Sequence, residues 1–259
     1  ALALGGVWLM AGGSPDNQKQ RDFLTTTFQA GNFKDAYDGL RKLCLDPKDD
    51  PFQVGKDMDL AVQALRRLGR IDEADDFREE VIKVHAKNWR LLAAAADNYV
   101  NPGKTEHHGF IVAGKFNRGT KRGGAKYVNT LLRDRVRALQ LMDDAHKLIG
   151  NEADKLAAAE FYLQYARHLM NAGNHESWRL QYLSDLSKLP DYEEGYVYQR
   201  GFGGNHHGAP VDADGNPIYH HVPKSYETAA SDGQRWRWTL MQATELDPNR
   251  LSEVDQWFA

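Results

Sequence analysis

Cysteine is almost absent from this sequence, since Cys44 is the only one among 259 residues. A single cysteine excludes an internal disulfide framework and any metal site built from several thiolates. Cys44 stands in the run Leu43-Cys44-Leu45, which is typical of the buried face of a helix, so we interpret it as a small core residue. A nucleophilic role would need a base beside the thiol, and the sequence places none there.

The sequence also lacks a long hydrophobic run and a strong excess of charge. The formal net charge of −3 gives no global attraction to nucleic acid or to an anionic membrane. Residues 1–13 read ALALGGVWLMAGG and carry no charge, but this stretch is too short to span a membrane. It resembles the end of a signal peptide, and a docking segment or a trimmed anchor is the alternative. We therefore interpret residues 1–14 as a signal-like or anchor remnant and expect an exported protein, periplasmic or at the cell surface.

Three stretches of the sequence share a helix-turn-helix pattern: Phe23–Pro47, Ala61–His85 and Tyr162–Pro190. In each, a helical run ends at a glycine, which tolerates the left-handed backbone that stops a helix. Five residues later stands a candidate for an inward-facing side chain. The glycines are Gly31, Gly69 and Gly173, and the inward-facing candidates are Ala36, Ala74 and Trp178. The pattern predicts three antiparallel helix pairs.

These pairs resemble the tetratricopeptide family, whose units are antiparallel helices with glycine and alanine at such positions. In the first two pairs, the second helix carries apolar residues at helical spacing, namely Leu40 and Leu43 in one and Phe77 and Val81 in the other. The resemblance is partial, because the aromatic residue expected early in each first helix is missing or displaced. The spacing from Gly31 to Gly69 is also slightly longer than the family's usual period, so the repeats are degenerate.

Further helices are predicted between and after the repeats by apolar residues spaced three or four apart. They cover Asn88–Val100, Asn129–Ile149, Glu152–Ala172 and Tyr226–Leu246. The last of these closes with Leu246-Asp247-Pro248, which echoes Leu45-Asp46-Pro47. The fold class predicted is therefore all-α, with a tetratricopeptide-like array of helix pairs over residues 15–259.

Two glycine-rich inserts, at about 101–128 and 191–224, do not fit the repeat. Insertions in repeat proteins map to loops that often lie on the binding face. In the first insert, basic residues alternate with aromatic ones, which suits an acidic protein surface or, less well, a nucleic-acid strand. The phosphate-binding order Gly-Lys-Ser or Gly-Lys-Thr is absent, and a solvated loop with a short hairpin, in which Phe110–Phe116 forms one arm, is the plainer interpretation. The candidate partner-binding residues are Lys115, Phe116, Arg118, Lys121, Arg122 and Lys126, together with Trp238 from the helix after the second insert.

Histidines form three adjacent pairs within the inserts: His107-His108, His206-His207 and His220-His221. Imidazole is the commonest protein ligand for metals, so inserts that pack together could bring several rings to one ion. Neighbours in an extended chain point in opposite directions, so each pair offers one ligand at most. His108, His207 and His221 are the candidates, but neither a His-Glu-x-x-His helix nor a carboxylate at ligand spacing accompanies them. Hydrogen-bonding or stacking histidines are the favoured interpretation, and no cofactor is expected.

The segment Val211–Pro217 contains aspartates but does not have the spacing of an EF-hand calcium loop. Residues 210–221 are better interpreted as a β-hairpin with Asp214-Gly215 at its turn.

Long stretches of both inserts carry a second resemblance. GFIVAGKFNRGTKRGGAKYVN with RDRVRALQLM, and GAPVDADGNPIYHHVPKSYETAASDGQRWRW, resemble the N-terminal helical region of large bacterial alpha-2-macroglobulin-like proteins of planctomycete type. Many members of that family trap proteases with a bait region and a Cys-Gly-Glu-Gln or Cys-Leu-Glu-Gln thioester. Cys44 precedes Leu45-Asp46-Pro47 instead, so no inhibitory residue is carried over. The resemblance implies an exported accessory module.

The function predicted is non-catalytic: a protein-interaction or architectural module of an exported protein, whose protein partner the sequence does not identify. One alternative is a metal-dependent enzyme that uses the histidine pairs. The other is a binder of polyanions or nucleic acid through the basic insert, whose affinity would fall steeply with salt.

Overall fold

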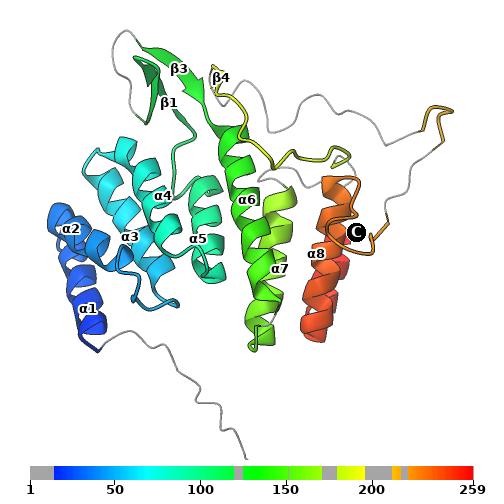
Figure 1. Ribbon diagram of the computed structural model, residues 1–259, viewed down its shortest axis with the longest axis horizontal. Coiled ribbons are helices and arrows are strands. Elements are labelled where there is room, and N and C mark those ends of the chain that lie inside the picture. The colour runs from blue at the N-terminus through cyan, green and yellow to red at the C-terminus, as the bar shows by residue number, and fades with distance from the viewer. Residues whose placement is uncertain are drawn as a thin grey trace, which may run out of the picture. The chain divides into compact units, whose positions relative to one another are not determined.

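The chain is mostly helical with a small antiparallel sheet, as seen in a computed structural model (Figure 1). The structure describes residues 15–119, 125–150, 152–170, 180–195, 212–216 and 221–258. It divides into two compact units, Ala1–Ala94 and Ala95–Ala259, whose boundary falls within one helix. The predominantly helical class predicted from the sequence is confirmed, and the strands are a small addition to it.

The first unit consists of helices that alternate in direction. They are α1 (Pro15–Gln29), α2 (Phe33–Cys44), α3 (Val54–Arg67), the short 3-10 helix η1 (Ile71–Glu73), α4 (Ala74–Val84) and the start of α5 (Trp89–Val100). Gly31 and Gly69 end α1 and α3 with φ of 83° and 68°, so the predicted left-handed turns are present at both. Ala36 and Ala74 are fully buried, as predicted.

Close approach of backbones distinguishes two helix contacts in the first unit. A methyl group at Gly39 in α2 would lie 2.3 Å from a methyl group of Leu24 in α1. One at Gly55 in α3 would lie 2.8 Å from the Cβ of Ala94 in α5. Glycine at these two positions therefore lets the helices touch, and the apolar stripes Leu40, Leu43, Phe77 and Val81 close the core.

The second unit combines the end of α5, a sheet and four helices. Its elements are β1 (His108–Val112), β2 (Lys115–Arg118), β3 (Lys126–Asn129), α6 (Leu131–Ile149), α7 (Lys155–Met170), β4 (Glu193–Glu194), α8 (Asp232–Leu246), η4 (Pro248–Arg250) and α9 (Leu251–Phe258). The strands are antiparallel in the order β2-β1-β3-β4. Figure 1 shows the sheet beyond the N-terminal end of α6, with β3 leading directly into that helix.

The third expected helix pair differs from the prediction. We expected Tyr162–Pro190 to contain both helices, but residues 180–190 are not helical. Instead α8 packs along α7. The segment at Leu180 is joined to the start of α8, because the Leu180 carbonyl accepts a hydrogen bond from the amide of Gly233. Gly173 and Trp178 lie outside the described residues.

Three smaller expectations also need correction or completion. The helix expected from Tyr226 begins only at Asp232, because the Ser231 side chain accepts a hydrogen bond from the amide of Gln234 and caps the helix there. Phe110–Phe116 is not one arm of a hairpin but its tip, since the chain reverses at Ala113-Gly114, with φ of 49° and 80°. In the second insert the turn at Asp214-Gly215 is present, and the strands expected on either side lie largely outside the described residues.

Candidate functional site

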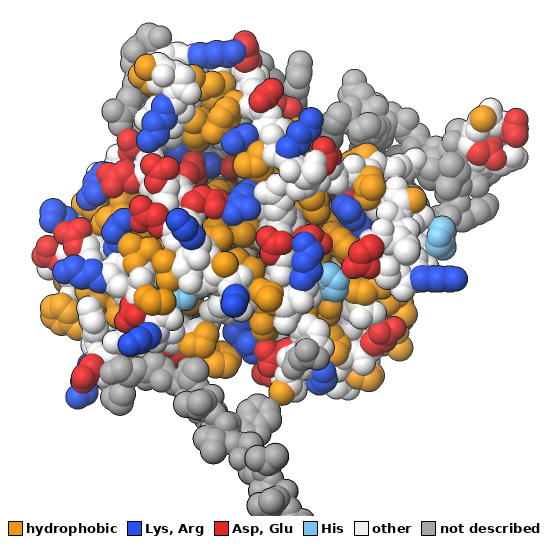
Figure 2. All heavy atoms as spheres, viewed as in Figure 1, with side chains coloured by type: hydrophobic (Ala, Val, Ile, Leu, Met, Phe, Trp, Pro, Cys, Tyr) orange, Lys and Arg blue, Asp and Glu red, His pale blue; other side chains and the backbone are white. Residues whose placement is uncertain are grey.

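The sheet brings together residues of both inserts. Directly paired residues of antiparallel strands share a face, so the register places Phe116, Ile111 and Lys126 in one row across β2, β1 and β3. The next row on that face holds Arg118, Gly109, Val128 and Glu194. Figure 2 shows hydrophobic side chains bordered by basic and acidic ones over this end of the molecule.

Gly109 allows the Phe116 ring to lie flat on the sheet. A Cβ at Gly109 would meet the carbonyl oxygen of Asn117 at 2.3 Å and the Phe116 ring at 2.5 Å. A side chain here would therefore displace the ring from the sheet, and the glycine is a requirement of this surface.

The second insert docks on the first through Tyr192. Its ring stacks on Phe116 with a centroid distance of 4.6 Å and an interplanar angle of 19°. The Arg133 guanidinium, at the start of α6, covers the same tyrosine ring at 4.6 Å and donates a hydrogen bond of 2.7 Å to the carbonyl of Pro190. These contacts form a three-layer stack of Phe116, Tyr192 and Arg133.

Beside this stack, β4 adds to the edge of β3. The ladder pairs Val128 with Glu194 and Asn129 with Glu193. Glu194 also forms an ion pair with Lys126 on the same edge. The two inserts, which the sequence could not place relative to each other, therefore meet in one sheet.

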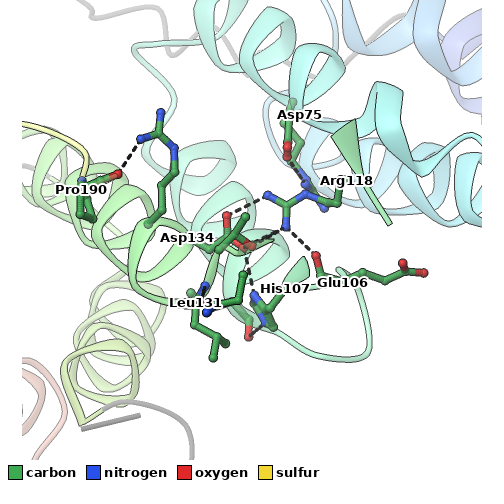
Figure 3. A network of polar contacts seen from close by, with 12 residues as sticks. Asp75, Glu106, His107, Arg118, Leu131, Asp134 and Pro190 are labelled. Atoms are coloured by element: carbon green, nitrogen blue, oxygen red, sulfur yellow. Dashed lines mark hydrogen bonds and ion pairs between the residues drawn. The ribbon is translucent and has the colours of Figure 1, made fainter. Parts of the chain in front are cut away.

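A buried network of charges ties the sheet to α6 (Figure 3). Arg118 donates two hydrogen bonds of 2.8 Å to the two carboxylate oxygens of Asp134 and one of 2.7 Å to the carbonyl of Glu106. The Thr130 hydroxyl donates to Asp134 at 2.6 Å, and the Nδ1 of His107 lies 3.0 Å from the same carboxylate. Arg118, Asp134 and their partners therefore satisfy one another inside the protein.

The charge of Asp134 is fixed by these partners. Burial alone would raise the pKa of this carboxyl group, but the charge of Arg118 and the hydrogen bonds from Arg118 and His107 outweigh it and lower the pKa well below its usual value. A carboxylate held ionised by a buried arginine is poorly suited to accept or deliver a proton near neutral pH. The network therefore has a structural role: it holds β2 and the loop before β1 against α6.

The candidate residues from the sequence fall into different environments. Lys115 and Lys126 are exposed, and Phe116 is half-buried under Tyr192. Arg118, expected at a partner-binding surface, has a side chain only 2% exposed and points inward to Asp134. Lys121 and Arg122 lie outside the described residues.

The histidine candidates are not assembled into a metal site within the described part of the chain, where no group of three His, Cys, Asp or Glu residues is placed to hold an ion. His108, the first residue of β1, stacks on Tyr127 with ring centroids 6.0 Å apart, while His107, just before the strand, points to Asp134, so the two rings do not converge. His221 is exposed, and His207 lies outside the described residues.

Trp238 lies away from the face of the sheet that carries Phe116, Lys126 and Glu194. It packs with His146, Tyr162 and Tyr226, at centroid distances of 5.2 to 5.9 Å. Burial lowers the pKa of His146 and raises the pKa of Tyr162 to about 12, so both rings are neutral near pH 7. Because Arg133 and His146 are thirteen residues apart in α6, this aromatic cluster lies about 20 Å from the sheet surface.

Sequence reasoning missed Tyr192, Arg133 and Glu194, which complete the sheet surface. Glu194 is exposed and forms an ion pair with Lys126. The sequence signal for this contact is the charge complementarity between the basic first insert and the Tyr-Glu-Glu run at the start of the second.

Comparison with known protein families, with curated proteins and with solved structures found no match. Among the described helices, none is both long and apolar enough to cross a membrane.

Proposed function

We propose that this chain is a non-catalytic protein-interaction or architectural module of an exported protein, built as a degenerate tetratricopeptide-like array. The arrangement of inserts supports this. The first lies between α5 and α6 and the second between α7 and α8, and strands from both inserts join in one sheet. The exported setting, and a place in the N-terminal helical region of an alpha-2-macroglobulin-like protein, rest on the sequence resemblances alone.

The observation that carries the proposal is the contrast between buried and exposed charges in the sheet. Asp134 and Arg118, the buried charged residues, form an ion pair with each other and are not available to a substrate. Lys115, Lys126 and Glu194 instead face solvent. These exposed charges surround the stack of Phe116, Tyr192 and Arg133, and an aromatic centre with a polar rim is the usual composition of a protein–protein interface. The acidic Glu193 and Glu194 beside Lys126 disfavour a polyanion as the partner, because they offset the positive charge.

Site-specific photo-crosslinking in cells that make the native full-length protein tests this proposal. A photoreactive residue would replace Lys126 or Glu194, which share one face of the sheet, or Leu156 as the control. Leu156 lies on α7 and is 63% exposed. We expect one protein to be captured from positions 126 and 194 and not from 156. No capture above the control would overturn the proposal.

Two further measurements address the alternatives. Stoichiometric metal in the purified protein, together with a turnover activity lost in His108→Ala or His221→Ala, would favour an enzyme instead. Binding to heparin or to a thymidine oligonucleotide that weakens steeply with salt would favour a polyanion binder. The proposal predicts neither result.

A further inference from the structure

The contact between Tyr192–Glu194 and the sheet has the form of a peptide in a recognition site. β4 adds as an extra edge strand to β3, which is a recurring way for proteins to bind extended segments. The ring of Tyr192 inserts between Phe116 and the guanidinium of Arg133. Glu194, two residues further along the strand, forms an ion pair with Lys126. The backbone, an aromatic ring and an acidic group are thus recognised separately.

The same contact is short. β4 has two residues, both exposed, and pairs with two of the four residues of β3. Gly195 follows with φ of 102°, which ends the extended conformation. The Lys126–Glu194 ion pair has side chains 55% and 72% exposed, so solvent and salt screen it. An edge strand of this kind is held largely because it is tethered to the rest of the chain.

We propose that the edge of β3, with the Phe116 ring, Arg133 and Lys126, is a docking site for an extended protein segment carrying an aromatic residue followed by acidic residues. Tyr192–Glu194 occupies this site in the isolated chain and competes with the partner. The inference rests on the proposed function and specifies the chemistry of the partner. The tethered segment weakens the apparent affinity of any partner, because the incoming segment must replace a ring stack, two ladder pairs and an ion pair at once.

Peptide binding to the full chain tests this site. The probe is a fluorescently labelled synthetic peptide with the sequence of Leu189–Gly195, Leu-Pro-Asp-Tyr-Glu-Glu-Gly. The variant Y192A/E194A weakens the internal occupant. We expect this variant to bind the peptide at least tenfold more tightly than the unmodified protein does. Adding K126E to it should reduce the affinity about tenfold, and a probe with alanine in place of tyrosine should not bind.

The control variants separate a loss of folding from a loss of peptide binding. If Y192A/E194A does not unfold cooperatively, the single variant E194A replaces it, since that side chain is exposed. Equal binding to the unmodified and weakened proteins, binding that ignores K126E, or displacement of the peptide by a thymidine oligonucleotide would overturn the docking site. Crosslinking from positions 126 and 194 could still succeed in that case, so the failure of this inference is separable from failure of the proposed function.

Discussion

Arg135 and Asp232 are 97 residues apart in the sequence and form a buried ion pair with an N–O distance of 3.0 Å. Arg135 lies in α6 and also donates hydrogen bonds to the carbonyl of Leu169 at the end of α7 and to the hydroxyl of Ser184. Asp232 is the first residue of α8 and accepts hydrogen bonds from the hydroxyl and the amide of Ser184. One pair therefore joins three helices and the segment that connects two of them.

Removal of Asp232 should destabilise the second unit. Asp232→Ala leaves the buried guanidinium of Arg135 without its charge partner, which typically costs about 3–5 kcal/mol of unfolding free energy. Urea denaturation followed by tryptophan fluorescence measures this, because Trp236 is buried in α8. Lys147→Ala, which removes exposed ion pairs with Asp143 and Asp144, is the control and should change the midpoint little. A midpoint for Asp232→Ala equal to that of the control would contradict the prediction.

The glycine in the middle of α2 should resist replacement although alanine is the better helix former. A Cβ at Gly39 lies 2.3 Å from a methyl group of Leu24, a residue only 4% exposed, so either Leu24 leaves its packed rotamer or the α1–α2 contact opens. Overpacking of this kind costs about 1–3 kcal/mol, and over most of that range it exceeds the gain of about 1 kcal/mol in helix propensity. Thermal unfolding followed by circular dichroism should show a lower midpoint for Gly39→Ala.

Two matched variants test the cause of that change. Gly150→Ala places a Cβ where no atom lies within 4 Å, so it should not lower the midpoint. Leu24→Ala combined with Gly39→Ala should be less destabilising than the sum of the two single changes, because the clash is absent. Strict additivity would mean that the two residues do not meet.

Local signals in the sequence were sufficient for much of the first unit. Gly31 and Gly69 mark the turns because left-handed backbone favours glycine, and Leu40 and Phe77 mark buried faces by their helical spacing.

The second unit was harder to predict because its order depends on contacts distant in sequence. The helix that packs on α7 begins at Asp232, and the glycine pattern in Tyr162–Pro190 indicated a nearer partner. In the sequence, Arg118 is indistinguishable from the other basic residues of the first insert. Its structural role follows only from its burial against Asp134. Composition cannot distinguish a buried arginine from an exposed one, because the partner carboxylate lies sixteen residues away in another element.

The lone thiol should be inert in the folded protein. Cys44 is fully buried, and burial raises the pKa of its thiol, so the reactive thiolate is scarce as well as inaccessible. Its carbonyl accepts a hydrogen bond from the Nε2 of His85, which holds the end of α2. Labelling with a chromogenic disulfide reagent at pH 8 should be at least about 1000-fold slower in buffer than in urea, because it requires opening of the core. Cys44→Ser combined with Lys34→Cys supplies an exposed thiol and should react at once. Equally fast labelling of Cys44 would contradict the burial.

The stability of the first unit should fall as the pH rises from about 4 to above 6. Arg21 in α1 contacts both Asp57 in α3 and Asp49 in the loop before it, so one buried cation faces two carboxylates. Burial raises the pKa of Asp57 to about 6 from 3.8, against the lowering effect of Arg21, and the charge of Asp49 raises it further. Because the folded protein holds this proton more tightly than the unfolded chain, the stabilisation is complete below pH 3.8. It is lost as the pH rises through about 6.

Asp57→Asn isolates this contribution, because asparagine resembles the protonated carboxyl group and does not titrate. The difference in unfolding free energy between the variant and the unmodified protein should shift in favour of the variant by about 2–3 kcal/mol between pH 4 and pH 7.5. Thermal unfolding across that range, with Asp38→Asn as an exposed control in the same unit, measures the shift. The comparison cancels the titration of all other carboxyl groups, which both proteins share. A difference that stays constant with pH would show that Asp57 keeps its ordinary pKa and that Arg21 neutralises both carboxylates.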